Sequence, residues 1–289
     1  MSNTSVAPGP ASQPRSATAQ SLRTAWTILR ICIEERLTYR GDFALGTLMR
    51  FLPVVTQTFL WSAVFVGAGS PGRIGGFTSN EFVAYYLLTY VARAFSSMPG
   101  LANHIAAQVR TGELKKYLVQ PVDLLTFLLL SRLAHKLVYY AVAAGPFVLV
   151  FFLCRDFFPA WPDAATIGAF ALSLALSFLL GFYLEATLGM IGFWFLEVGS
   201  LLFVYMLFNF FFSGHMFPPT IMPGVWGRIV LALPLVYLAY FPAAVFLGKV
   251  QGAALVQGLA VEAVWVVVFF ATAKLAYAAG LKRYGAYGG

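Results

Sequence analysis

Six apolar stretches, each close in length to a membrane-spanning helix, dominate this sequence. A helix needs about 20 consecutive, mostly apolar residues to cross the hydrocarbon core of a bilayer. Hydrophobic residues make up 60% of the chain and charged residues only 10%, whereas soluble domains carry about 25% charged residues. We therefore predict an all-α membrane protein with six transmembrane helices. The six stretches are residues 43–66, 81–98, 129–153, 164–184, 187–212 and 256–279.

A seventh apolar stretch, residues 229–247, differs from the others because Pro234 and Pro242 interrupt it. Proline breaks a helix, and the resulting pieces are too short to cross about 30 Å at about 1.5 Å per residue. We expect residues 215–250 to form a broken, partly re-entrant hairpin on the outer side, between the fifth and sixth spans. Irregular backbone at membrane depth needs protein or water around it, so this hairpin is expected to border a pathway. The candidates for an outer gate are Pro218, Pro223, Trp226 and Pro234.

The positive charges are distributed unequally between the two sides of the predicted bundle. The chain has 19 Lys and Arg against 11 Asp and Glu, a formal net charge of +8. Thirteen of the basic residues flank one side, and only Arg73, Arg155, Arg228 and Lys249 flank the other. Because basic residues accumulate on the cytoplasmic side, both termini are predicted to be cytoplasmic in a multi-pass protein of the plasma membrane. The basic residues form no compact patch, so no nucleic-acid partner is expected.

The N-terminal part of the chain contains no predicted span. Residues 1–20 are rich in Ser, Pro, Ala and Thr and are predicted to be a disordered cytoplasmic tail. Residues 21–42 place apolar side chains at helical spacing and arginines off that stripe. This pattern predicts an amphipathic helix that lies in the membrane interface, with an ordinary packed amphipathic helix as the alternative. The stripe consists of Leu22, Trp26, Leu29, Ile33 and Leu37.

The sequence lacks the common motifs for catalysis, nucleotide binding and metal binding. The phosphate-binding pattern GxxxxGK[ST] is missing, because Gly248-Lys249 is not followed by Ser or Thr. His104, His135 and His215 are far apart and have no cysteines at metal-ligand spacing. The chain is therefore not expected to be an enzyme, or to bind a cofactor or a metal itself.

Two alternative functions stay open at this point. A membrane-embedded transferase could use His104 and His135, which lie on the predicted cytoplasmic side near Asp123. A secondary transporter that works without ATP would be expected to show internal repeats with paired broken helices. Only one broken segment is visible in the sequence.

Charged residues inside the predicted spans are functional candidates, because a charge in the hydrocarbon core is costly. Arg93 lies about 18 Å below the outer end of the second span, and Glu197 lies about 15 Å above the inner end of the fifth, counting about 1.5 Å per residue. At these similar depths the two side chains form a buried pair, or one of them faces the cavity of the dimer, unless the boundaries of these spans are misjudged. Glu262 lies in the outer third of the sixth span, close enough to the outer interface to reach it. Lys274 is expected to snorkel to the inner interface, with Glu185 as a candidate partner.

The most informative segment is the predicted cytoplasmic connection between the second and third spans, residues 103–123. An amphipathic helix breaks there at Gly112, restarts for about two turns and stops before Pro121. The pattern Arg-x-Gly-x-Leu-x-x-x-Leu-x-x-Pro, residues 110–121, resembles the loop of ABC type-2 export permeases in which a short helix docks on the partner ATPase. The resemblance implies a docking segment that contains His104, Arg110, Gly112, Glu113, Leu114, Lys115 and Pro121.

The resemblance extends over most of the chain. Residues 21–42 are similar to the family's connecting helix, residues 213–237 to its outer stretch between spans five and six, and residues 281–288 to the ending of a poorly characterised bacterial subgroup. It implies an ABC type-2 transmembrane domain over residues 43–289, in the permease subunit of a bacterial exporter. Two permeases, identical or related, would pair with two soluble ATPase subunits that bind ATP and Mg²⁺. Membrane lipids surround such a permease, and its substrate could be lipid-like, amphiphilic or drug-like.

Overall fold

The computed structural model of the chain describes residues 17–37, 49, 52–69, 72–119, 122–195 and 197–284. Within these ranges the fold is all-helical, apart from one isolated bridge between Ile74 and Phe77. Three helices are long and apolar enough to cross a membrane: α7 (Leu124–Leu153), α12 (Gly252–Arg283), and α8 (Ala164–Met190) with the 3₁₀ turn η2 (Ile191–Phe193) that continues it. Two shorter apolar helices are α3 (Leu52–Gly67) and α9 (Gly199–Phe212). The predicted all-α membrane class is confirmed.

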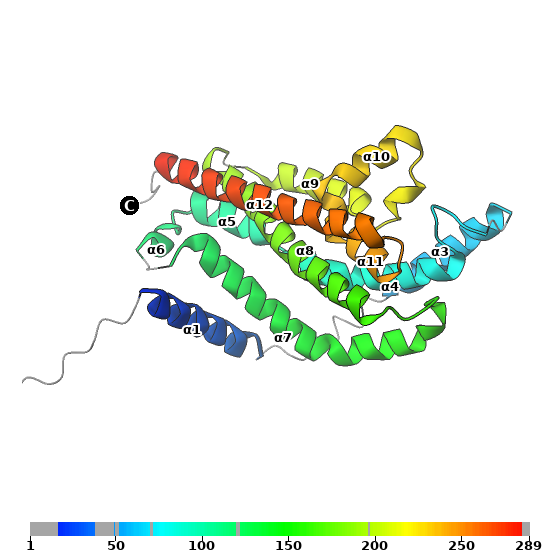
Figure 1. The fold of residues 1–289 in the computed structure, drawn as a ribbon. Helices are drawn as coiled ribbons and strands as arrows, with labels where there is room; N and C mark the ends of the chain where they lie inside the picture. Colours follow the sequence, from blue (N-terminus) through cyan, green and yellow to red (C-terminus); the bar gives the residue numbers. More distant parts are fainter. Residues whose placement is uncertain are drawn as a thin grey trace, which may run out of the picture.

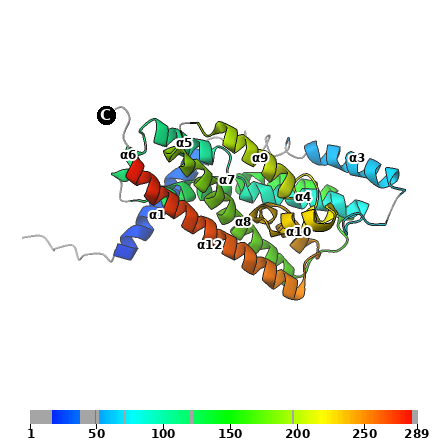
Figure 2. The ribbon, with the colours of Figure 1, turned by 90° about the horizontal axis from the view of Figure 1, so that it is seen from above.

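Helix α8 is the centre of the bundle. It packs against α12, α4 (Ser79–Ser96), α5 (Leu101–Arg110) and α11 (Tyr240–Phe246) (Figures 1 and 2). Glycine permits the closest of these approaches, because a Cβ atom on Gly181 would overlap the backbone carbonyl of Ser96 in α4. Two groups of buried apolar residues lie on either side of this crossing, one towards α11 and one towards α5.

Three helices lie at the edges of this bundle. Helix α7 packs mainly against α1 (Ala17–Leu37), with a smaller contact to α4 (Figure 1). Helices α3 and α9 lie along one side of the molecule when it is viewed from above (Figure 2). The structure describes all of α9, and none of its residues is buried. In α3 only Val54 and Phe65 are buried. These edges therefore present apolar surface.

The segment between α9 and α12 is broken into short helices, as its prolines predict. They are η3 (Pro219–Ile221), α10 (Gly224–Ala232), η4 (Pro234–Leu238) and α11. Pro234 begins η4, but Pro242 lies in the first turn of α11 and interrupts nothing. A proline is tolerated in a first turn because its missing N–H would have no helical partner there. The expected division at Pro242 is therefore wrong, and the second break lies at Ala239.

Two predicted boundaries are corrected. The fourth span does not end at residue 184, because α8 continues through Glu185 to Met190, and the link to α9 lies at residues 194–198. The sequence predicts a span boundary at Glu185 because a charged residue usually lies at the membrane interface. At the N-terminus, α1 begins at Ala17, so residues 17–20 are helical. Residues 1–16 of the predicted tail, residues 38–42 of the predicted amphipathic helix and most of residues 43–51 lie outside the described residues.

Candidate functional site

The connection between α4 and α7 forms a compact protrusion at one end of the bundle (Figure 1). Helix α5 ends at Arg110, and Gly112 adopts φ +75°, a left-handed conformation that favours glycine. The chain reverses there, and the amide of Leu114 donates to the carbonyl of Gln108 at 3.2 Å. A single turn, α6 (Lys115–Leu118), follows. The helix break predicted at Gly112 is thus present, while Pro121 lies outside the described residues.

One face of this protrusion is buried, and it includes a residue predicted to be on the surface. Leu114 is 0% exposed and packs in an apolar cluster with Leu101, Ile105, Tyr117 and Leu124. The reversal at Gly112 turns Leu114 back towards α5. Its assignment to a docking surface is therefore corrected, because its side chain holds the protrusion together.

The opposite face is exposed, and we call it the α5–α6 surface. Its two apolar side chains, Leu118 and Val119, are 46% and 85% exposed. Sequence reasoning missed Val119, although its position two residues before Pro121 was a signal that the short helix ends there. The other members of the α5–α6 surface are the polar residues Asn103, His104, Arg110, Thr111, Glu113, Lys115 and Lys116. An apolar tip with a polar surround is typical of a protein-binding surface.

The charge of the α5–α6 surface is positive. Lys116 Nζ lies 3.1 Å from Glu113 Oε2, an exposed ion pair of small energetic value. Partial burial, with smaller contributions from Arg132 and Lys116, lowers the pKa of His104, and Glu113 opposes this shift. His104 is therefore neutral near pH 7, so the positive charge comes from the arginine and the lysines.

Helix α5 is seated directly on α8 and η2. A Cβ atom on Gly189 would lie 2.9 Å from the carbonyl oxygen of Ala102, and one on Gly192 would lie 2.9 Å from the Cα atom of Ala106. The two backbones therefore approach as closely as glycine allows, and close-packed elements transmit displacement. A displacement of α5 would therefore be transmitted to α8 at this contact.

A second connection joins the protrusion to α4 and α7. Lys136 of α7 is 7% exposed, and its Nζ donates to the carbonyls of Ala94 at 2.5 Å and Ser97 at 2.6 Å. Arg132 donates to the carbonyl of Pro99 at 3.1 Å, and Glu185 Oε1 accepts from the amide of Met98 at 3.4 Å. We call Arg132, Lys136 and Glu185 the hinge cluster. Its cations satisfy carbonyls at and just beyond the end of α4, where the helix dipole favours positive charge.

The structure does not bring Arg93 and Glu197 together. The carboxylate within electrostatic reach of Arg93 is Glu185, not Glu197. Glu197 accepts a 2.6 Å hydrogen bond from the amide of Gly199 and lines a small polar pocket with Arg110 of α5. The expected pair is not formed because α8 is longer than predicted, which places Glu197 at the α5 end of the bundle.

The other charged candidates also have definite places. Glu262 of α12 is 0% exposed and accepts a 2.9 Å hydrogen bond from the Ser173 hydroxyl of α8, so it does not reach an interface. Lys274 forms a 2.7 Å ion pair with Asp123, which also caps α7, and not with Glu185. This pair ties the α5 end of α12 to the start of α7.

The candidates for an outer gate lie at the opposite end. Pro218 is buried at the start of η3, Pro223 and Trp226 are exposed at the start of α10, and Pro234 is half-buried. The Ser96 hydroxyl donates to the carbonyl of Leu238 at 2.8 Å, which pins the broken segment to α4. At the far end of α4, Lys249 and Glu81 form a 2.7 Å ion pair. These contacts fix the broken segment against the core, and no gate movement follows from them.

A family model matches most of the chain. The sequence model of a family described as "ABC-2 family transporter protein" matches residues 51–288, from the start of α3 to beyond the end of α12. No protein among the curated ones matches the chain.

Proposed function

Because the chain belongs to the ABC-2 family of transporter proteins, we propose that it is the permease subunit of an ABC exporter in a bacterial plasma membrane. Two ATPase subunits bind the α5–α6 surfaces of two permeases, and ATP and Mg²⁺ are held by the ATPases. The observation that carries this proposal is the α5–α6 surface itself. It has exposed apolar side chains that an ATPase can bind, and α5 packs closely against α8. Movement of a bound ATPase can therefore be transmitted to the membrane-spanning helices.

The coupling path runs through two connections. Movement of the α5–α6 surface displaces α8 through Gly189 and Gly192, and displaces α4 and α7 through the hinge cluster. Such a movement changes the packing of the broken segment, because α11 packs on both α4 and α8. The pathway therefore opens at the end of the bundle opposite the ATPases. The cargo is an amphiphilic, lipid-like or drug-like compound.

The test is co-isolation from native membranes. The tagged chain, extracted in a mild detergent, is expected to co-purify with a soluble ABC ATPase in equal amounts. A transferase or a secondary transporter would purify without one. Stoichiometric recovery of a correctly inserted chain with no ATPase, after chemical cross-linking of the cells, would refute the proposal.

The proposed topology has six crossings, by α3, α4, α7, α8, α9 and α12, with residues 215–250 as a re-entrant segment. Lys282 and Arg283 at the end of α12 lie at the same end as α5 and α6 (Figure 1). Arg155 follows the end of α7, and Lys249 pairs with Glu81 at the start of α4, so both lie towards the other end. This arrangement agrees with the excess of basic residues on the cytoplasmic side.

A reporter fused after Gly289 tests this topology. Alkaline phosphatase at that position should be inactive, and green fluorescent protein should fluoresce, because six crossings return the chain to the cytoplasm. A matched fusion after Pro159, in the turn between α7 and α8, should give the opposite pair of results. Active phosphatase after Gly289 would require an odd number of crossings.

The proposed dimer uses the apolar surface of α9 and α3. Phe203 of α9 is 56% exposed, and Val267 of α12 is 64% exposed on another side of the bundle. In a chain with Cys32→Ser and Cys154→Ser, Phe203→Cys should cross-link to the second permease on oxidation. Val267→Cys is the matched control and should stay uncross-linked. The reverse pattern would place the dimer interface on α12.

A further inference from the structure

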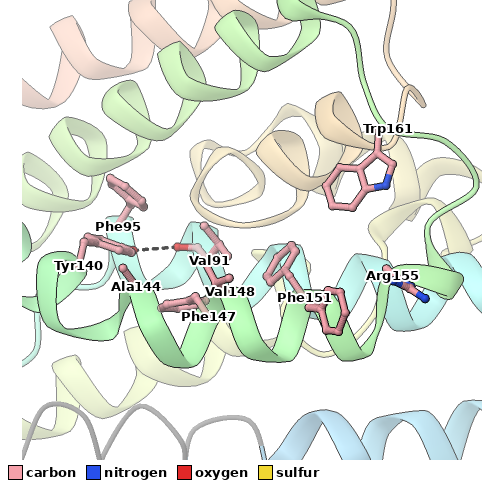
Figure 3. Close-up of a pocket in the computed structure, with 10 residues that line it drawn as sticks. Val91, Phe95, Tyr140, Ala144, Phe147, Val148, Phe151, Arg155 and Trp161 are labelled. Carbon is pink, nitrogen blue, oxygen red and sulfur yellow. Dashed lines mark hydrogen bonds between the residues drawn. The ribbon is translucent and has the colours of Figure 1, made fainter.

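A long apolar groove runs along α7 on the side that faces α4, and the proposed function gives it no role. It encloses about 590 Å³. Aromatic side chains from both helices form its walls, and the hydroxyl of Tyr140 donates to the carbonyl of Val91 at 3.1 Å across its closed end (Figure 3). The lining residues are Val91, Phe95, Tyr140, Ala144, Phe147, Val148, Phe151, Phe152, Arg155 and Trp161.

The groove exists because α7 stands away from the rest of the bundle. Its direction changes within its length (Figure 1), and it contains Pro146, which removes one helical hydrogen bond. Val148 and Phe152 of the lining are 69% and 60% exposed. Apolar side chains this exposed in a membrane protein face lipid or a bound apolar ligand.

The length of the groove matches one lipid leaflet. Tyr140 lies at one end and α7 ends at Leu153 near the other, and the 13 helical steps between these two residues rise about 20 Å at about 1.5 Å per residue. Half of a bilayer, headgroup region included, is about 20–22 Å thick. Phe95 and Tyr140 stack at 4.1 Å between ring centroids and close the groove near the bilayer centre. An acyl chain from one leaflet would therefore fill the groove and stop at this stack.

The open end carries two opposite charges side by side. Arg155 Nε lies 3.6 Å from Asp156 Oδ1, and the two side chains are 59% and 89% exposed. The guanidinium of Arg155 also lies over the Phe152 ring, 4.9 Å from its centroid, which holds the cation at the mouth of the groove. Trp161, 64% exposed, adds an indole that suits the headgroup region. A cation next to an anion complements a phosphate next to an ammonium group.

We propose that this groove binds an aminophospholipid of the phosphatidylethanolamine type. The phosphate lies against Arg155, the ammonium group donates to Asp156, and one acyl chain follows Phe151 and Phe147 to the stack at Tyr140. A singly anionic headgroup fits less well, because the neighbouring carboxylate repels it. The lipid belongs to the leaflet opposite the ATPases, and this assignment rests on the proposed topology. Bound there, the lipid fills the space between α4 and α7.

Lipid retention by the full chain tests the proposal. The protein is purified in nanodiscs that contain equal parts of phosphatidylethanolamine, phosphatidylglycerol and phosphatidylcholine, and the lipid that stays bound after release is measured by native mass spectrometry. The wild type should retain phosphatidylethanolamine at least 5-fold over the other two. Preferential retention of phosphatidylglycerol, or no preference, would overturn the proposal.

Paired variants separate the groove from the general lipid belt. Val148→Trp fills the groove and should reduce retention at least 5-fold. Leu149, the next residue of α7, is 52% exposed but does not line the groove, so Leu149→Trp should leave lipid retention unchanged. Equal effects of the two variants would show that the bound lipid is only part of the belt around the protein. Asp156→Asn should remove the preference for phosphatidylethanolamine over phosphatidylcholine, and Arg155→Gln should weaken retention of all three lipids.

A photoactivatable phosphatidylethanolamine with its reactive group at the end of the acyl chain gives a readout that needs no variant. It should label residues near Phe95 and Tyr140. Labelling confined to α3 or α9 would contradict the groove. None of these measurements uses an ATPase, so their failure leaves the proposed permease function intact, and loss of the ATPase partner leaves the lipid site intact.

Discussion

The double variant Leu118→Asp with Val119→Asp is expected to lose its ATPase partner while it still inserts in the membrane. Each of these side chains is exposed, so the change leaves the packed cluster around Leu114 untouched. Burial of two such side chains in an interface contributes about 3 kcal/mol, and two buried carboxylates add a further cost. The affinity for the ATPase should therefore fall by about 100-fold or more, together with transport.

The measurement is co-purification of the ATPase, with insertion checked by the yield and the size-exclusion profile. Val225→Asp is the matched control, since Val225 is 58% exposed at the opposite end of the bundle. Leu114→Asp is not suitable for this purpose, because it places a carboxylate in a fully buried site and should lower the stability of the whole protrusion. Normal ATPase association in the Leu118/Val119 variant would move the docking site elsewhere, with α1 as the next surface to test.

Lys136→Met is expected to separate ATPase binding from transport. The change removes the donor that satisfies the carbonyls of Ala94 and Ser97 at the end of α4. Hydrogen bonds to a charged group contribute about 1.5–3 kcal/mol each, so the loss of both should lower the stability by about 3–6 kcal/mol, and the loss arises at the hinge cluster. The α5–α6 surface is unchanged, so the ATPase still binds, but its displacement no longer moves α4.

Two readouts distinguish this role from a general loss of stability. The variant should keep the ATPase at wild-type stoichiometry and lose at least 10-fold in ATP-dependent transport. Lys136→Arg, which keeps the charge and the donors, should recover part of the transport rate. Lys282→Met removes an exposed lysine and should have no effect. Loss of the ATPase and of transport in equal measure would assign Lys136 a purely structural role.

The all-helical class and the break at Gly112 were predictable from the sequence because each depends on local properties. Apolar run length sets a span, and glycine permits the left-handed turn that ends α5. The broken segment was predictable for the same reason, since Pro234 cannot continue α10.

The positions of the charged residues were not predictable, because tertiary contacts decide them. A charge in an apolar run normally marks the membrane interface, so the sequence predicts that the fourth span ends just before Glu185. It is instead part of α8 and is compensated by groups from α4 and α7, which are distant in sequence. Because α8 extends beyond the predicted end of the fourth span, Glu197 lies in the link between α8 and α9, away from its expected partner Arg93.

The exposed face of the α5–α6 segment also depends on the fold. Leu114, Leu118 and Val119 are equally apolar, and only the reversal at Gly112 decides which of them is buried. A helical wheel over the whole segment fails here, because the helix does not continue through the turn.

Photo-cross-linking from position 119 tests the central claim most directly. A benzoylphenylalanine in place of Val119, activated in intact cells, should give an adduct that mass spectrometry identifies as a soluble ABC ATPase. The same group in place of Trp226, which is 70% exposed at the other end of the bundle, should give none. If position 119 yields no ATPase adduct in a correctly inserted chain, or if position 226 yields one, the α5–α6 surface is not the docking site and the proposed coupling path is wrong.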